Sequence, residues 1–208
     1  MTHGVLSGRA IQKAVREGAI FIDPFTPAQL NPVSYDLTLG EEVRVYEDVN
    51  YLHEEVSAPG TFDGRHIQPL TGIHPGTHYL DSKKPNPTKS FKIKDEGWLL
   101  KPGVGYLMHT HERVRTDHFV PVVDGKSSIG RLFIAVHVTA GYIDPGFDGC
   151  YTLEVMALHP VKVYARQRIC QVRFHTIMGE VTLYDGHYKG DTAKGAVASH
   201  SYEQFEDK

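Results

Sequence analysis

Apolar and polar residues alternate with a period of two through most of the chain after residue 91. The alternation is clearest in residues 104–110, 132–138, 151–157 and 170–174. Gly and Pro residues separate these runs at intervals of about 10 residues, a spacing typical of consecutive strands in sandwiches, jelly rolls and barrels. This part of the chain is therefore predicted to be all-β.

The first residues follow a helical period instead. Ser7 is a suitable N-cap, and Ile11 and Ala14 recur at the spacing of one helix face. Leu6 and Ile11 occupy the two positions of a hydrophobic staple, and Gly18 suits the left-handed residue that ends a helix. These signals predict one short helix between Ser7 and Gly18.

The remaining segments have mixed character. Residues 21–25 are predicted to end a strand and enter a turn, residues 31–40 to form a strand, and residues 43–45 another. Residues 47–90 contain five prolines and few periodic apolar positions, so we expect an irregular excursion and not a separate domain. Residues 185–208 are rich in Gly, which predicts a mobile C-terminal tail.

The composition is that of an ordinary globular protein. Of the 208 residues, 40% are hydrophobic and 23% are charged. We therefore expect a single domain over residues 1–208 that needs no disulfide or metal to form its core. The net charge of −3 disfavours nucleic acid as a partner, because sequence-independent binding depends on a surplus of Lys and Arg.

Signals of export and membrane insertion are not found in the sequence. The N-terminus has no charged segment followed by an apolar one, and no apolar run approaches the ~20 residues that span a bilayer. The two cysteines, Cys150 and Cys170, cannot build a disulfide framework. We therefore expect a protein of a reducing compartment, the cytoplasm, with no membrane partner.

The densest group of polar residues is segment 124–131, Asp-Gly-Lys-Ser-Ser-Ile-Gly-Arg. Its small residues allow backbone N–H groups to approach a phosphate, and Lys126 and Arg131 supply positive charge. Ser127 and Ser128 add two hydroxyls between them. An ordinary polar surface turn explains the same residues, because short Gly/Ser patterns are common.

A second candidate is the turn-rich hairpin at residues 139–149, which carries Asp144 between apolar neighbours. Main-chain groups of a tight hairpin can bond to a flat base, while a carboxylate accepts a hydrogen bond from a sugar hydroxyl. A plain Asp-Pro-Gly turn, which is a frequent type of loop, is the alternative. The sequence leaves both interpretations open.

Glu154 lies in an apolar strand, residues 151–156, with no other charge nearby. An unpaired buried carboxylate costs several kcal/mol, so such a residue either faces water on an exposed strand or is retained for a purpose. A carboxylate that is kept from water can act as a general acid and base. Both interpretations stay open at this point.

Thirteen histidines raise the question of a metal site. His109 and His111 share a strand face, but no third ligand is patterned near them, so no zinc site is expected. Zinc nucleobase deaminases carry His-x-Glu followed by Pro-Cys-x-x-Cys. Residues 53–55 fit only the first half, and the cysteines are 20 residues apart. A Gly-x-Ser-x-Gly nucleophile motif is not found either.

Three segments together resemble the dCTP deaminase branch of the dUTPase superfamily. They are residues 124–131, residues 137–147 (His-Val-Thr-Ala-Gly-Tyr-Ile-Asp-Pro-Gly-Phe) and residues 152–154 (Thr-Leu-Glu). Further similar segments are residues 31–40, 100–103 and 195–199. The resemblance implies a distorted β-barrel or jelly roll of the dUTPase-like type, with a short N-terminal helix. It also implies a homotrimer whose active sites lie between subunits.

The resemblance assigns catalytic roles to four residues. Glu154 would be the general base and proton shuttle. Ser127 and the carbonyl of Ala140 would hold the attacking water, and Arg131 would orient Glu154 and balance its charge. One carboxylate that alternates between two protonation states can serve both proton transfers of a deamination, so this mechanism is independent of zinc.

The resemblance also describes how the nucleotide would bind. Lys126 and Ser128 would hold the triphosphate, and Mg²⁺ would accompany the triphosphate without activating the water. Asp144 would bind the 3′-hydroxyl of the deoxyribose, Phe147 would pack against the sugar, and the C-terminal tail would fold over the nucleotide. Further nucleotide-binding residues on this basis are Ser127, Arg131, Thr139, Gly141, Tyr142, Tyr188, Lys189 and Lys194.

Two regions depart from the pattern of some family members. Gly141 stands where some deaminases carry a larger polar residue, and it is similar to members that also cleave the product to dUMP and pyrophosphate. In the tail, His187 precedes Tyr188 at a position where family members often carry Lys. Residues 191–194 make the tail about two residues longer than in those members. The preference for a triphosphate over a monophosphate or a base-modified cytosine therefore stays open.

Zinc-independent deamination of dCTP to dUTP and ammonia, with or without further conversion to dUMP, is the leading hypothesis for the function. A dUTPase-like pyrophosphatase without deamination would use Asp144 to activate water and leave Glu154 without a role. A nucleotide-binding regulator would keep the fold and lose catalysis. Retention of the serine, the arginine and both carboxylates favours an enzyme.

Overall fold

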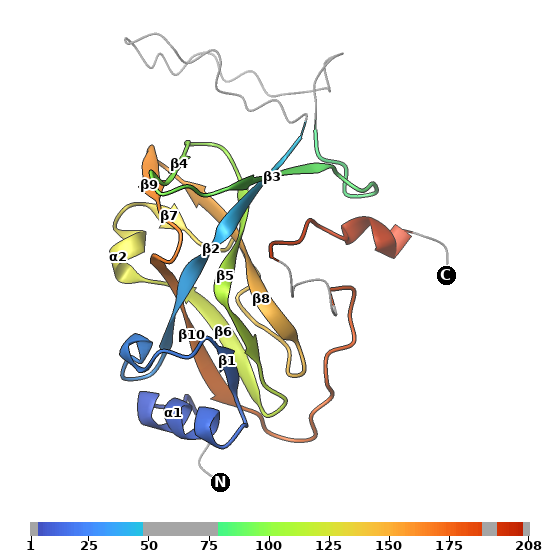
Figure 1. Ribbon diagram of the computed structural model, residues 1–208. Coiled ribbons are helices and arrows are strands. Elements are labelled where there is room, and N and C mark those ends of the chain that lie inside the picture. The colour runs from blue at the N-terminus through green and yellow to red at the C-terminus, as the bar shows by residue number, and fades with distance from the viewer. Residues whose placement is uncertain (1–3, 48–78, 189–194, 206–208) are drawn as a thin grey trace, which may run out of the picture.

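The computed structural model describes residues 4–47, 79–188 and 195–205, in which strands predominate (Figure 1). The helices are α1 (Gly8–Arg16), α2 (Ser127–Gly130), and the 3₁₀ helices η1 (Pro27–Gln29) and η3 (Ser201–Phe205). The strands are β1 (Phe21–Asp23), β2 (Tyr35–Tyr46), β3 (Thr88–Lys92), β4 (Trp98–Leu100), β5 (Tyr106–Arg115), β6 (Phe119–Gly125), β7 (Ile134–Ala135), β8 (Asp148–Ala157), β9 (Val161–Val163) and β10 (Arg168–Thr176).

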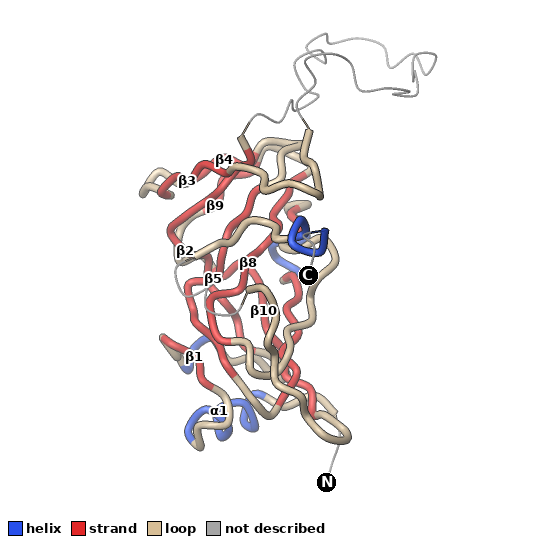
Figure 2. The backbone as a smooth tube through the Cα atoms, turned by 90° about the vertical axis from the view of Figure 1, so that its right-hand side faces the viewer, coloured by secondary structure: helices blue, strands red, loops and turns tan. Residues whose placement is uncertain are grey.

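Eight of these strands form one sheet that curves into a nearly closed barrel (Figures 1 and 2). Its main path runs in the order β6-β10-β2-β5-β8-β7, and β1 and β3 pair with β5 and β2. All of these pairs are antiparallel. β4 and β9 form a separate two-stranded sheet. The predicted all-β, barrel-like fold with a short N-terminal helix is confirmed.

Helix α1 forms where its capping residues predict it. The Ser7 hydroxyl accepts the N–H of Ala10 at 3.3 Å, and Gly18 adopts a φ of 75° beyond the last turn. Ile11 and Ala14 are buried against the barrel, and this burial supplies most of the stability of so short a helix. No helix in the described ranges is long and apolar enough to cross a membrane.

Alternation along β8 decides which side chains enter the core. Tyr151, Leu153 and Val155 are buried there. Thr152 and Glu154 lie between them and therefore project from the other face of the sheet. Burial of one side chain of this size contributes about 1.5–3 kcal/mol, so a one-residue slip that would place Glu154 in the core is strongly disfavoured.

The strands predicted at residues 31–40 and 43–45 are one strand, β2. It begins at Tyr35, and its pairing with β5 is irregular between Leu39 and Val43. Such an irregularity increases the bend and twist of a strand without ending it. The glycine and the two charged residues between the predicted strands therefore lie at an irregularity within β2 and do not end a strand.

The run at residues 132–138 contains a shorter strand than predicted. Only β7 pairs with β8 there. Phe133 has a φ of 56°, and both Leu132 and Phe133 are exposed. The chain is still leaving the α2 turn at these residues, so pairing cannot begin before Ile134.

The predicted excursion and tail are more regular than expected where they are described. Residues 88–90, placed in the excursion of residues 47–90, belong to β3 and pair with β2. Residues 48–78 of that excursion lie outside the described residues. Within the tail predicted to be mobile at residues 185–208, Ala196 is only 2% exposed. The described end of the tail therefore packs against the barrel.

Candidate active site

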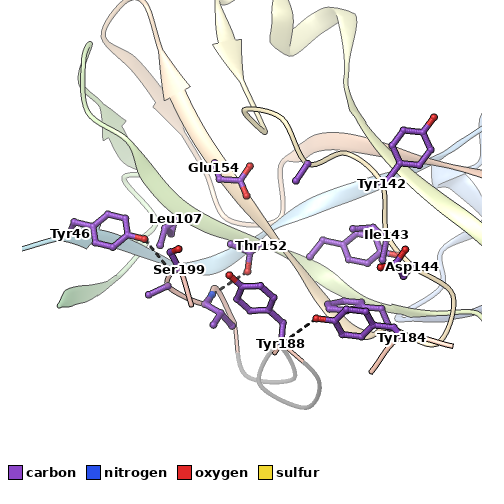
Figure 3. Close-up of a pocket in the computed structure, with 15 residues that line it drawn as sticks. Tyr46, Leu107, Tyr142, Ile143, Asp144, Thr152, Glu154, Tyr184, Tyr188 and Ser199 are labelled. Carbon is purple, nitrogen blue, oxygen red and sulfur yellow. Dashed lines mark hydrogen bonds between the residues drawn. The ribbon is translucent and has the colours of Figure 1, made fainter. Parts of the chain in front are cut away.

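A cavity of about 430 Å³ opens between β8, the hairpin that follows β7, and the C-terminal tail (Figure 3). Aromatic and aliphatic side chains make up most of its walls, with a few polar groups among them, as is usual for small-molecule sites. Six predicted site residues line it, namely Ala140, Tyr142, Asp144, Phe147, Glu154 and Tyr188. The two most informative segments of the sequence, the hairpin and the Thr-Leu-Glu strand, thus meet at one place.

Glu154 lines the cavity from the outward face of β8 and is half-buried. Its Oε2 accepts the backbone N–H of Val138 at 3.2 Å, which is its one hydrogen bond within the described residues. The residue opposite on β5 is Leu107, which also lines the cavity. An ionised carboxylate has about four acceptor positions, so most of its capacity is left for a ligand. Glu154 is therefore neither a solvent-facing residue nor a fully buried one.

The backbone of the hairpin is attached to β6. The N–H of Val123 donates to the carbonyl of Gly141 at 2.7 Å, and the N–H of Ile143 donates to the carbonyl of Pro121 at 2.9 Å. A Cβ atom at residue 141 would lie 2.8 Å from the Val123 carbonyl oxygen, which is too close. Gly141 therefore allows the hairpin to approach β6 closely enough to make these bonds.

This attachment fixes the residues that the hairpin presents. Asp144 and Tyr142 are both exposed at the edge of the cavity. The Phe147 ring lies 5.9 Å from the Tyr151 ring and 5.7 Å from the Tyr184 ring, centroid to centroid, and these form an aromatic wall. Burial raises the pKa of the Tyr151 hydroxyl well above its ordinary value, so this hydroxyl stays uncharged.

The tail covers the cavity from the other side. The N–H of Val197 donates to Thr152 Oγ1 at 3.1 Å, and the N–H of Ser199 donates to the Tyr46 hydroxyl at 3.2 Å (Figure 3). Tyr188 lines the cavity beside them. That Tyr188 binds the nucleotide stays a prediction.

Segment 124–131 lies elsewhere on the barrel. Lys126 pairs with Asp36, whose side chain is 1% exposed. Asp124 pairs with Arg173 on β10. The segment contributes the cation to the first ion pair and the anion to the second, and the two pairs anchor it to β2 and β10. The start of α2 is therefore held in a fixed position, with its two serines on the surface.

Some predicted site residues do not line the cavity within one chain. These are Lys126, Ser127, Ser128, Arg131, Thr139 and Gly141. Ser127, Ser128 and Arg131 are exposed, whereas the Lys126 ammonium group forms an ion pair with Asp36. The other two predicted residues, Lys189 and Lys194, lie outside the described residues.

Sequence reasoning missed several residues that line the cavity, among them Tyr46, Leu107, Thr152 and Tyr184. Thr152 could have been found, because strand alternation places it on the same face as Glu154. Leu107 and Tyr46 come from β5 and β2, and only the register of these strands brings them to the site. A single sequence holds no local signal for such contacts.

His109 and His111 lie away from this cavity. They share one face of β5, as predicted, and line a second cavity with Glu41, Glu42 and Arg166. Burial and the nearby Arg166 guanidinium lower the pKa of His111, which favours the neutral imidazole. Within the described parts of the chain, no group of three or more His, Cys, Asp or Glu side chains is placed to hold a metal ion.

A family model described as dCTP deaminase-like matches residues 5–177. A protein from Clostridium beijerinckii, named "dCTP deaminase, dUMP-forming", is 39% identical over 203 residues, which cover 97% of this chain and 99% of that protein. A protein of the same name from Leptospira biflexa is 38% identical over 205 residues, which cover 98% of this chain and 99% of the relative.

Among solved structures, 2′-deoxycytidine 5′-triphosphate deaminase from Agrobacterium tumefaciens matches with a TM-score of 0.57 and 24% identity. The match covers 85% of this chain and 49% of that one, so the chain spans about half the length of the solved protein. At this identity the likeness speaks for the fold alone. It agrees with the barrel described above.

Proposed function

The chain belongs to the dCTP deaminase-like family, and from this premise we propose that it converts dCTP to dUMP in two hydrolytic steps. In the first step water replaces the 4-amino group of cytosine, which yields dUTP and ammonia. In the second step water cleaves dUTP to dUMP and pyrophosphate. The relatives that match over nearly the whole chain are named dUMP-forming, which supports both steps.

The observation that carries the proposal is the position of Glu154. This carboxylate stands half-buried in a cavity whose walls are mostly apolar, and its oxygens are largely free for a ligand. A pyrimidine nucleoside is flat and partly apolar, so the aromatic wall around Phe147 suits it. Asp144 at the rim offers an acceptor for the 3′-hydroxyl of the sugar.

Glu154 would move the protons of the deamination. Its carboxylate takes a proton from water as the oxygen attacks C4, and returns that proton to N3. It then takes the proton of the new hydroxyl and gives it to the amino group, which leaves as ammonia. Positioned proton transfer of this kind contributes about 10²–10⁴ in rate. Orientation and electrostatics supply the rest.

Other groups would hold the attacking water and balance the charge. The carbonyl of Ala140 lies in the same cavity as Glu154. Ser127 and Arg131 do not reach this cavity in their own chain, so we propose that they act in the cavity of a neighbouring copy. An active site shared in this way requires an oligomer, and we propose a homotrimer.

The surface beside α2 supports such an assembly. Leu132, Phe133, Met156 and Leu158 are each at least 40% exposed, and a groove of about 330 Å³ runs along β7 and β8 among them. Contiguous exposed apolar side chains usually mark a protein contact. Copies that meet at this face would cover it and bring α2 of one copy near a second copy.

The triphosphate requires local positive charge, since the net charge of the protein is −3. We propose that Ser128, Lys126 and the tail residues Lys189 and Lys194 contact it. Lys126 can bond to a phosphate while it pairs with Asp36, because an ammonium group has three donors. Mg²⁺ would bind the phosphate oxygens of the nucleotide and offset their charge.

A product assay tests this function. The full chain is incubated with dCTP and Mg²⁺, and ammonia, dUTP, dUMP and pyrophosphate are quantified over time. We expect ammonia, dUMP and pyrophosphate in equal amounts. Conversion of dUTP without release of ammonia from dCTP would indicate a pyrophosphatase instead. Tight binding of dCTP without any product would indicate a regulator.

The same assay separates the remaining alternatives on the substrate side. dCMP and 5-methyl-dCTP are offered in place of dCTP at equal concentration. We expect dCTP to give the highest kcat/KM, because the proposed cations contact the β- and γ-phosphates. A higher kcat/KM with dCMP or 5-methyl-dCTP would reassign the substrate to a monophosphate or to a base-modified cytosine.

A further inference from the structure

Side-chain hydroxyls of the barrel accept backbone N–H groups of the tail at two positions. Thr152 Oγ1 accepts the N–H of Val197 at 3.1 Å, and the Tyr46 hydroxyl accepts the N–H of Ser199 at 3.2 Å. Figure 3 shows these two side chains reaching the tail from different strands. Residues 197–199, which line the cavity, are thus attached at both ends to its opposite wall.

The start of this segment is fixed by burial. Ala196 is 2% exposed, and Gly195 is buried with a φ of 132°. Gly195 lies against His109 and Glu42 of the barrel. Only glycine adopts this backbone conformation without strain, so the chain can turn sharply into the barrel here. Opening of the tail at residue 196 would therefore expose buried surface.

The other end of the segment is held more weakly. The N–H of His200 donates to the hydroxyl of Tyr188 at 3.1 Å, but Tyr188 belongs to the tail itself. Ser201 donates to the carbonyl of Ser82 at 3.0 Å on the exposed surface. Among the described residues, the Tyr46 hydroxyl is therefore the barrel side chain that bonds to this end of residues 197–199 at the cavity.

We propose that Tyr46 is a positioning residue that keeps the tail closed between the two hydrolytic steps. This inference depends on the proposed function. Tyr46 forms no covalent bond and transfers no proton in either step. It holds Ser199, so that residues 197–199 remain over the nucleotide while ammonia leaves and a second water attacks the phosphate chain.

The consequence concerns the fate of dUTP. After deamination, dUTP either proceeds to dUMP or escapes into solution, and the two outcomes compete. Loss of the Tyr46 hydroxyl removes one hydrogen bond that holds the tail closed. A neutral hydrogen bond contributes about 1 kcal/mol, so the tail should open about fivefold more often. The binding of dCTP and the retention of dUTP should then weaken together, while the rate of deamination at Glu154 should stay the same.

The test compares Tyr46→Phe with wild type and with Tyr164→Phe. Tyr164 is exposed in the turn between β9 and β10 and is not among the residues that line the cavity, so it serves as the matched control. For Tyr46→Phe we expect a KM for dCTP raised about fivefold. The kcat for ammonia release should stay within about twofold of wild type. Free dUTP should appear in the medium before dUMP does. Tyr164→Phe should match wild type in all three.

Unchanged KM and an unchanged ratio of dUTP to dUMP in Tyr46→Phe would overturn the proposal. So would a fall in kcat together with a lower melting temperature, because that result would indicate a general structural role. Hydrogen exchange measured without nucleotide separates this inference from the proposed function. Tyr46→Phe should exchange faster at residues 197–200, whether or not the wild type deaminates dCTP, and equal exchange would overturn the inference.

Discussion

Glu112 and Glu154 stand on neighbouring strands of the same sheet, and their surroundings are opposite. Glu112 projects inward from β5 and is 1% exposed. Its two oxygens accept hydrogen bonds from the Gln29 side chain at 2.8 Å, the Thr38 hydroxyl at 2.8 Å and the Thr38 N–H at 2.7 Å. Glu154 projects outward from β8 into a cavity and accepts one backbone N–H in the described structure.

The difference shows how a barrel separates structural carboxylates from reactive ones. Three donors of its own chain bond to Glu112, which is also buried, so this side chain has little acceptor capacity left and no space for a substrate. Glu154 has both. The face of the strand on which each residue falls decides between the two roles, and that face is set by the alternation of apolar residues.

The largest expected effect is that of Glu154→Gln on activity. The amide has the same shape but cannot take a proton from water, so ammonia release from dCTP should fall by about 10²–10⁴. The unfolding midpoint in urea should stay close to that of wild type. Glu180→Gln, a change at an exposed residue, serves as the control and should keep full activity. Near wild-type deamination by Glu154→Gln would remove this residue from the mechanism.

The second effect concerns which chain supplies the groups that contact each carboxylate. The donors to Glu112 come from one chain, whereas Arg131 is proposed to reach Glu154 from another copy. Glu154→Gln and Arg131→Ala should each be inactive alone. Co-expressed in equal amounts, they should form trimers in which roughly a quarter of the sites hold both wild-type residues.

Ammonia release from the mixed preparation, compared with each variant alone, measures this recovery. Activity no higher than the mean of the two variants would place Glu154 and Arg131 in one chain or would show that Arg131 has no role.

A smaller effect is expected at Glu112, and on stability instead of chemistry. Glu112→Gln replaces one acceptor oxygen with an amide N–H₂ group that faces the donors of Thr38 or Gln29. A buried donor left without a partner costs about 1–3 kcal/mol. The free energy of unfolding in urea should fall by that amount, and kcat of the folded protein should stay near wild type. A loss of kcat without a loss of stability would contradict the division between the two carboxylates.

The smallest effect is the pH dependence that His111 contributes. Burial, and then Arg166, lower its pKa below the ordinary value of 6.5. The unfolded chain therefore takes up this proton at a higher pH than the folded chain does. Stability from the neutral imidazole is complete above pH 6.5 and is lost as the pH falls through the lowered value of the folded state.

Urea unfolding of wild type and His111→Asn at about pH 7.5 and about pH 5.5 measures this contribution. Wild type should lose more stability on acidification than the variant does. An equal loss in both proteins would show that His111 does not contribute.

Local patterns were sufficient for the parts of this molecule whose physics is local. Helix α1 begins after Ser7 and ends before Gly18, as predicted, because capping depends on neighbouring residues. The apolar frame of β8 singled out Glu154, and the turn residues of the hairpin singled out Asp144. Both carboxylates line the cavity.

The parts that sequence reasoning missed depend on pairing between distant segments. Glu112 sits between His111 and Arg113 and has the appearance of an exposed polar residue, although Thr38 and Gln29 bury and satisfy it. The pairing of Lys126 with Asp36 joins residues 90 positions apart. The hydrogen bond between Tyr46 and Ser199 joins residues 153 positions apart in the sequence. No pattern within a single segment encodes such contacts.

The most direct test of the account is a crystal structure of Glu154→Gln with dCTP and Mg²⁺. We predict that the amino-bearing carbon of cytosine lies beside residue 154, with a water within about 3 Å of both. The triphosphate should contact Ser128 of a neighbouring copy, and Asp144 should contact the 3′-hydroxyl. A base bound away from residue 154, with that side chain facing open solvent, would contradict the central claim.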